Sequence, residues 1–127
     1  AGRVVGKIIA RHKEPAAREV IKWRTAKNLW LRRISIISFV GHARKGDALF
    51  KGALQMILET AATVVKSDER FHQTGVGWVI REVYKGNPKI AERFIDTHLR
   101  YFSREGLRYA IEKMPEKQRK EYLARPI

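Results

Sequence analysis

Apolar residues recur at intervals of three and four positions along almost the whole chain, which is the spacing of one face of an α-helix. The segment from Leu49 to Val65 follows this spacing most closely. No long stretch alternates with a period of two, and no Asn-Gly hairpin signal occurs. The pattern therefore predicts an all-α protein of about seven or eight helices joined by short polar turns.

Capping residues indicate where these helices begin and end. A first helix is expected around Val4 to Ile9, and Pro15 is expected to open the second, because a missing amide proton is tolerated in a first turn. Gly41 is expected to end the third helix, and Asp47 to cap a long fourth one. The remaining helix starts are expected at Ser67 or Asp68, at Asn87 with Pro88, and at Ser103.

The third helix carries an apolar stripe. We expect one side of it to face the core, formed by Trp30, Leu31, Ile34, Ile37 and Ser38.

Three helical segments share a local pattern in which a small residue precedes a large one. They are centred on Ile34, Val76 and Tyr109, and their spacings of 42 and 33 residues are typical of two-helix solenoid units. Chance similarity among amphipathic helices is the alternative. If the repeat is real, its second helices form one concave wall, and adjacent helices approach closely at the small residues Ser35, Gly77 and Ala110.

Trp78 lies opposite the aliphatic stripe of its own helix. At about 100° per residue it shares a sector with Thr74, Arg81 and Lys85 instead of with the valines. A ring of this size rarely faces solvent without a partner. Either Trp78 packs against a neighbouring helix of a multilayer fold, or Trp78, Arg81 and Lys85 line a basic surface that holds a sugar-phosphate chain. The charge of the whole chain favours the second interpretation.

That charge is strongly positive. With 27 Lys and Arg against 13 Asp and Glu, the formal net charge is +14 on 127 residues. Such an excess repels itself in a folded chain unless a polyanion neutralises it, so nucleic acid is the expected partner. No apolar run approaches the roughly 20 residues needed to span a bilayer, so a membrane is not expected as a partner.

Cysteine is absent, which excludes disulfides, a thiol nucleophile and thiolate zinc sites and suits a cytoplasmic, intracellular protein. The four histidines lack the spacing of metal ligands, and no glycine loop for phosphates or nucleophile elbow occurs, so we expect neither a metal nor a cofactor. Among the four histidines, His72 lies on the apolar side of the Trp78 helix and is expected to be a hydrogen-bonded core residue.

One domain is expected over residues 1–127, as a monomer.

Three segments resemble a known family. NLWLRRISIISFV, FHQTGVGWVIREVYKG and LRYAIEKMPEKQRKEYL are similar to the second half of the AlkD-like DNA alkylation repair glycosylases, from about Trp23 onward. The resemblance implies HEAT-like helical repeats and double-stranded DNA with alkylated bases in a concave basic groove. The implied reaction is hydrolysis of the N-glycosidic bond of 3-methyladenine-type or 7-methylguanine-type purines, without deep base flipping.

The resemblance also implies roles for individual residues. Trp78 matches the groove tryptophan that contacts the deoxyribose at the lesion, where an aromatic face can stabilise an oxocarbenium-like sugar. Arg81 matches an arginine that grips the DNA backbone, and Arg32 and Arg33 belong to the family's WxRR string, on phosphates. The layer of second helices adds two DNA-binding candidates, Lys85 and Arg108.

The sequence departs from the family at the catalytic aspartate, whose tryptophan-and-aspartate motif is expected just before the first helix and is not in these 127 residues. We therefore expect either the C-terminal part of a longer glycosylase or a reduced homologue that binds without cutting. Glu82 is the carboxylate nearest Trp78 along the helix, but a salt bridge with Arg81 or Lys85 is the commoner arrangement. The rival interpretations are a non-catalytic nucleic-acid-binding helical repeat protein and a protein-interaction solenoid.

Overall fold

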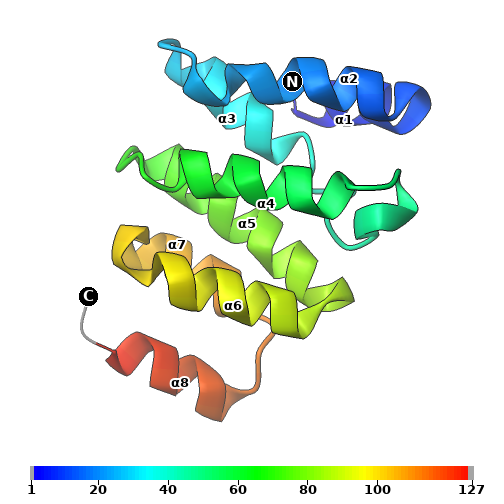
Figure 1. The fold of residues 1–127 in the computed structure, drawn as a ribbon. Helices are drawn as coiled ribbons and strands as arrows, with labels where there is room; N and C mark the ends of the chain where they lie inside the picture. Colours follow the sequence, from blue (N-terminus) through cyan, green and yellow to red (C-terminus); the bar gives the residue numbers. More distant parts are fainter. Residues whose placement is uncertain (1, 126–127) are drawn as a thin grey trace.

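The computed structural model describes residues 2–125, and this part of the chain contains eight α-helices and no strand (Figure 1). The prediction of an all-α fold is therefore confirmed. The helices are α1 (Gly2–His12), α2 (Glu14–Ile21), α3 (Leu29–Ile37), α4 (Ala53–Val64), α5 (Arg70–Gly86), α6 (Pro88–His98), α7 (Arg104–Ile111) and α8 (Glu116–Ala124). Short 3₁₀ turns span Lys22–Thr25, Gly46–Ala48 and Leu99–Tyr101.

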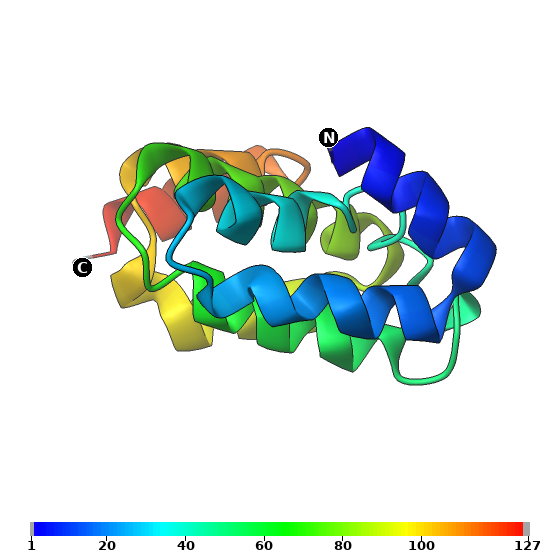
Figure 2. The same cartoon turned by 90° about the horizontal axis from the view of Figure 1, so that it is seen from above.

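The helices stack in pairs, in the order α2 with α3, α4 with α5 and α6 with α7 (Figure 1). Figure 2, viewed from above, shows α2, α4 and α6 in one layer and α3, α5 and α7 in the other. α1 crosses one end of the stack, and α8 lies at the opposite end (Figure 1). The segments with the shared small-large pattern are thus the second helices of successive pairs, as a helical repeat requires.

A continuous apolar core lies between the two layers. Its fully buried side chains come from every helix from α1 to α7, so every pair contributes to the same core. These residues include Ile36, Ile57, Ile80, Ile95 and Leu107. Within residues 2–125, no helix combines the length and apolar character needed to cross a membrane.

Glycines in the middle of α5 bring three helices close together. A Cβ atom on Gly77 would overlap the backbone oxygen of Gly106 and lie 2.8 Å from Cβ of Tyr109, both on α7. A Cβ atom on Gly75 would lie 3.1 Å from Cγ2 of Ile37 on α3. The small residues therefore allow the close approach expected from the sequence, which explains glycine in a helix interior at a cost of about 1 kcal/mol each.

A buried glutamine connects the loops at one end of the stack. The side-chain amide of Gln73 lies 2.7 Å from the carbonyl oxygen of Val65, 2.8 Å from that of Ser67 and 2.9 Å from that of Tyr101. Its own Oε1 accepts the amide proton of Ser103 at 2.7 Å. One side chain thus satisfies backbone groups of both the α4–α5 and the α6–α7 connections.

Several predicted helix boundaries are confirmed. Pro15 lies in the first turn of α2, and Pro88 begins α6 after Asn87. Ser103 precedes α7 and accepts the amide proton of Gly106 at 3.0 Å, which is a side-chain N-cap.

The predicted start of α4 and end of α3 were wrong by several residues, and the predicted cap of α5 by one or two. α4 begins only at Ala53, because Gly52, with φ of 87°, turns the chain in the left-handed region. Asp47 nevertheless caps this helix from a distance, since its Oδ1 accepts the amide proton of Leu54 at 3.0 Å. α5 is capped by Glu69 instead of Ser67 or Asp68. α3 ends at Ile37, four residues before Gly41.

Candidate nucleic-acid interface

The exposed aromatic side chains of residues 2–125 gather on one layer. Trp30, Phe71, Trp78 and Tyr109 are 55%, 49%, 39% and 41% exposed, and all four belong to α3, α5 or α7. We call the exposed surface of these three helices the aromatic face. Because aromatic rings seldom remain in water without a partner, this face is the candidate binding surface of the molecule.

Trp78 lies in the middle of the aromatic face, on the central helix α5. At 39% exposure the residue is not enclosed within the stack, although the rest of it is covered by its neighbours. Its expected neighbour Thr74 is buried, however, at 9% exposure, because α3 and α7 flank α5 closely. The open part of the ring faces a surface cavity of about 470 Å³.

Trp30 does not join the core as expected from the apolar stripe of α3. It is exposed, and the guanidinium carbon of Arg33 lies 5.6 Å from the centre of the Trp30 ring. The same guanidinium lies 4.9 Å from the Phe71 ring of α5. Cation–π attraction therefore links α3 and α5 at this point. Nε of Arg33 is buried without a hydrogen-bond partner.

Arg81 and Lys85 lie on the same helix as Trp78, and both are paired with carboxylates. Nη1 of Arg81 donates to Oε2 of Glu112 at 2.8 Å, and Nε lies 3.4 Å from Oε2 of Glu82. Nζ of Lys85 lies 2.9 Å from that same Glu82 oxygen. The expected salt bridges of Glu82 are thus confirmed. The hydrogen bond from Arg81, together with its charge, holds the pKa of Glu112 below its usual value.

The other two predicted DNA-binding residues differ in their surroundings. Nε of Arg32 donates to the carbonyl oxygen of Ala26 at 2.5 Å, so this half-buried side chain stabilises the turn before α3. Arg108 is exposed on α7 and forms no ion pair within residues 2–125. The predicted cations therefore share one layer with Trp78, but they differ in how freely they can meet a ligand.

The cavity beside Trp78 brings in two cations that the sequence reasoning missed. Arg3 and Lys7 of α1 line it together with Trp78, and both are exposed. They are more than 70 positions from Trp78 along the chain, so no local pattern could join them. Only the packing of α1 across the end of the stack brings these cations to Trp78.

His72 is a structural residue, as predicted. It is 0% exposed, its Nε2 lies 2.7 Å from the carbonyl oxygen of Leu29, and its Nδ1 lies 2.7 Å from Oγ of Ser67. Because a carbonyl can only accept, Nε2 carries the proton and Nδ1 accepts from the serine. Within residues 2–125 no three His, Asp or Glu side chains are grouped as metal ligands would be.

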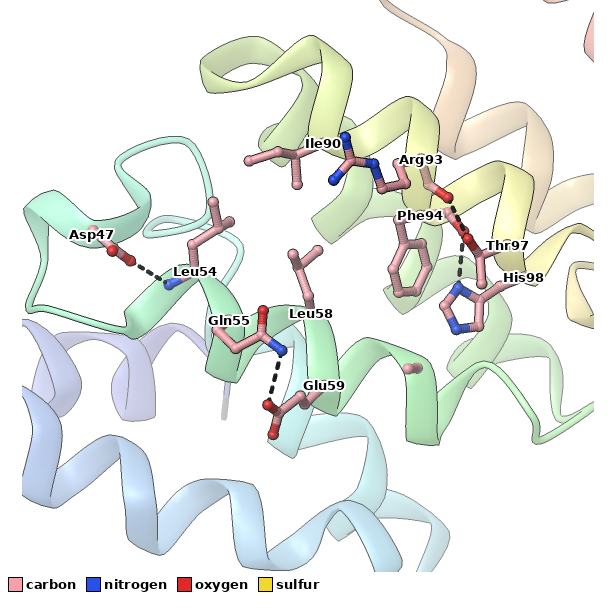
Figure 3. Close-up of a pocket in the computed structure, with 11 residues that line it drawn as sticks. Asp47, Leu54, Gln55, Leu58, Glu59, Ile90, Arg93, Phe94, Thr97 and His98 are labelled. Carbon is pink, nitrogen blue, oxygen red and sulfur yellow. Dashed lines mark hydrogen bonds between the residues drawn. The ribbon is translucent and has the colours of Figure 1, made fainter.

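A second cavity, of about 500 Å³, lies on the opposite layer between α4 and α6 (Figure 3). Apart from the exposed Arg93, its polar side chains form local hydrogen bonds, as the dashed lines in Figure 3 show. Gln55 donates to Glu59 at 3.0 Å, and Thr97 donates to the carbonyl oxygen of Arg93 at 2.8 Å. With no exposed aromatic ring, and with every polar side chain except Arg93 in a local hydrogen bond, this cavity lacks the features of the aromatic face.

Comparison with known proteins gives one family. A family model described as DNA alkylation repair enzyme matches residues 1–114. A search of curated proteins finds no match to the chain.

Proposed function

Because the chain belongs to the DNA alkylation repair enzyme family, with the family match covering residues 1–114, we propose that it serves as a DNA glycosylase for alkylated purines. The bond broken is the N-glycosidic bond of a purine that carries an alkyl group on a ring nitrogen. Duplex DNA is the substrate, and it lies along the aromatic face. The base is released without being drawn into a deep pocket of the protein.

The observation that carries this proposal is the position of Trp78. Its ring is open to solvent, it lies on the central helix of the aromatic face, and cations of α1 line the cavity beside it. Alkylation makes the purine cationic and a good leaving group, so the main catalytic requirement is stabilisation of positive charge on the sugar. The face of an indole ring provides such stabilisation by cation–π attraction, worth about 0.5 to 2 kcal/mol.

The arginines of the same layer have a different role in this proposal, which is to position the duplex. Arg33 and Arg108 contact phosphates directly, whereas Arg81 and Lys85 must first leave Glu82 and Glu112. Arg32 holds the turn before α3 and contacts DNA with the nitrogens that Ala26 does not engage. Phosphate contacts of this kind set affinity and register and carry no sequence information.

Glu82 is unsuited to act as the catalytic carboxylate in this arrangement. Its Oε2 already lies near both Arg81 and Lys85, so its negative charge is shared between two cations. The proposed reaction needs a less encumbered carboxylate near the sugar, because direct Coulomb stabilisation exceeds what an aromatic ring supplies.

Two measurements test the proposal. The first is the release of 3-methyladenine and 7-methylguanine from methylated duplex DNA, with unmethylated DNA as the control. The second is the affinity for duplex DNA as a function of salt, where log K should fall by roughly 0.9 per neutralised phosphate as log salt rises. Salt-dependent binding without release would favour a non-catalytic nucleic-acid-binding protein. Binding that is indifferent to salt would contradict both functions.

A further inference from the structure

The cavity beside Trp78 has a lining that fits a particular part of a DNA strand. Small residues of α1 form one wall, at intervals of four positions, which is one side of the helix. They are Gly2, Gly6 and Ala10. A Cβ atom on Gly6 would lie 3.0 Å from the carbonyl oxygen of Ser38, so this wall also depends on a close helix approach.

The neutral polar side chains of the lining have little to offer a nucleobase. The hydroxyl of Ser38 donates its only proton to the carbonyl oxygen of Ile34 at 2.5 Å. Nε2 of His42 lies 2.8 Å from the carbonyl oxygen of Gly6 and therefore donates to it, while Nδ1 is buried without a partner. A pocket for an extruded base would present free donors and acceptors to its edge. This cavity instead offers an apolar wall and two charged side chains.

Those charged side chains are Arg3 and Lys7, which lie four residues apart on α1 and therefore on one side of it. Neither forms an ion pair within residues 2–125, in contrast to Arg81 and Lys85. They are thus unpaired cations in a cavity lining that also contains Trp78. An apolar surface flanked by two cations matches a deoxyribose ring flanked by two phosphates.

We propose that Arg3 and Lys7 bind the two phosphates that flank the nucleotide whose sugar lies against Trp78. This inference rests on the proposed function, and it adds α1 to the DNA-binding surface. Because the flanking phosphates are bound equally before and during bond cleavage, these two residues contribute to affinity and not to the rate of the chemical step. Their contribution is electrostatic and therefore depends on salt.

The first test is the salt dependence of duplex binding by the whole chain, measured by fluorescence anisotropy. The double variant Arg3→Gln with Lys7→Gln should lower the slope of log K against log salt by about 1.8, since two contacts of about 0.9 are lost. Between 50 and 200 mM salt, the ratio of wild-type to variant affinity should then shrink by about 12-fold. The charge-conserving variant Arg3→Lys with Lys7→Arg should keep the wild-type slope.

The matched control is Arg93→Gln with Lys89→Gln. These residues are also an exposed Arg and Lys four positions apart, but they lie on α6, in the opposite layer. The control should leave the slope unchanged. A loss of slope in the Arg3 and Lys7 variant no larger than in this control would overturn the inference while leaving the proposed function intact.

The second test locates the contact. A duplex with a tetrahydrofuran abasic-site analogue is made with neutral methylphosphonate linkages on both sides of that analogue. The wild-type chain should lose about tenfold in affinity for it relative to the all-phosphate duplex, whereas the Arg3 and Lys7 double variant should lose less than about twofold. Equal losses in both proteins would overturn the inference. Failure of the wild-type chain to bind any duplex would overturn the inference and the proposed function together.

Discussion

Nη1 of Arg81 lies 2.8 Å from Oε2 of Glu112, and this ion pair joins α5, the helix that carries Trp78, to the C-terminal end of α7. The cation that the family resemblance assigns to the DNA backbone is therefore already neutralised by a residue of the same face. A phosphate must compete with Glu112 for the guanidinium. If the aromatic face binds DNA as proposed, the pair restrains that binding, and its removal has a measurable consequence.

Glu112→Gln should strengthen duplex binding, because it frees Arg81 and removes one negative charge from the face. If Arg81 then contacts a phosphate, the slope of log K against log salt should steepen by about 0.9. Glu121→Gln on α8 changes the net charge equally and should have a smaller effect on affinity and none on the slope. Equal effects of the two substitutions would show that Arg81 is not held back by Glu112.

Acidification should weaken the link between α5 and α7 made by Arg70 and Glu105. The hydrogen bond from Arg70, at 2.9 Å, lowers the pKa of Glu105 from its ordinary value of 4.5 in the unfolded chain. A carboxyl with a depressed pKa stabilises the fold above that ordinary value and loses its contribution as pH falls through the folded pKa. The melting temperature of Glu105→Gln should thus be lower than that of the wild type at pH 7, and the two should converge below about pH 4.5. A difference that persists unchanged at pH 3 would contradict this account.

Gly77→Ala should destabilise the protein. The added methyl group would overlap the backbone of Gly106 on α7, which cannot change rotamer to avoid it. We expect the free energy of unfolding to fall by about 1 to 3 kcal/mol or more, measured by urea denaturation. Gly41→Ala is the control, since nothing lies within 4 Å of its Cβ position, and it should change stability by less than about 0.5 kcal/mol.

Gln73→Leu should also destabilise the protein, through unpaired backbone groups. The substitution keeps a similar volume but removes the hydrogen bonds to the carbonyls of both loops and to the amide of Ser103. Each buried group left unpaired costs about 1 to 3 kcal/mol, so we expect a total loss of about 3 kcal/mol or more. Gln55→Leu removes one exposed hydrogen bond to Glu59 and should be nearly neutral. Comparable losses from both substitutions would rule out the bridging role of Gln73.

Trp78→Ala should reduce the rate of alkylpurine release at saturating protein by about tenfold or more, which corresponds to about 1.4 kcal/mol. Affinity for intact duplex should stay within about threefold. A second readout that needs no turnover is the preference for duplex with an abasic-site analogue, which the variant should lose. Trp30→Ala removes an equally large exposed ring that does not line the cavity and should retain that preference. Global unfolding of Trp78→Ala with no separable effect would favour a structural role for the ring.

Local sequence signals predicted the helices well where one residue determines a boundary. Ser103 and the Asn87-Pro88 pair act through neighbouring backbone groups, so their effect can be read from adjacent positions. The start of α4 was misplaced because Asp47 caps it from seven residues away, around a left-handed Gly52. Local periodicity cannot reveal a turn of that kind.

In the candidate site, even more of the important contacts come from residues that are distant in the sequence. The position of Trp78 on its own helix, opposite the aliphatic stripe, indicated an exposed ring, and in the structure Trp78 is 39% exposed. Its surroundings come from other helices. Glu112 meets Arg81 from 31 positions away, and Arg3 and Lys7 reach the cavity from the opposite end of the chain. The sequence could therefore identify the aromatic residue, but not the charges that decide which ligand it meets.

Gly75 and Gly77 give α5 a property that side chains could not provide. At Gly77 the distance from α5 to α7 is set by main-chain contact with Gly106, which does not adjust when rotamers change, and at Gly75 the β-branched side chains of Ile36 and Ile37 of α3 pack directly against the backbone of α5. The exposed side chains of these three helices are consequently held at a fixed spacing before any ligand binds. A surface prepared in this way loses little conformational entropy on association, and it favours ligands whose own repeat is regular and stiff.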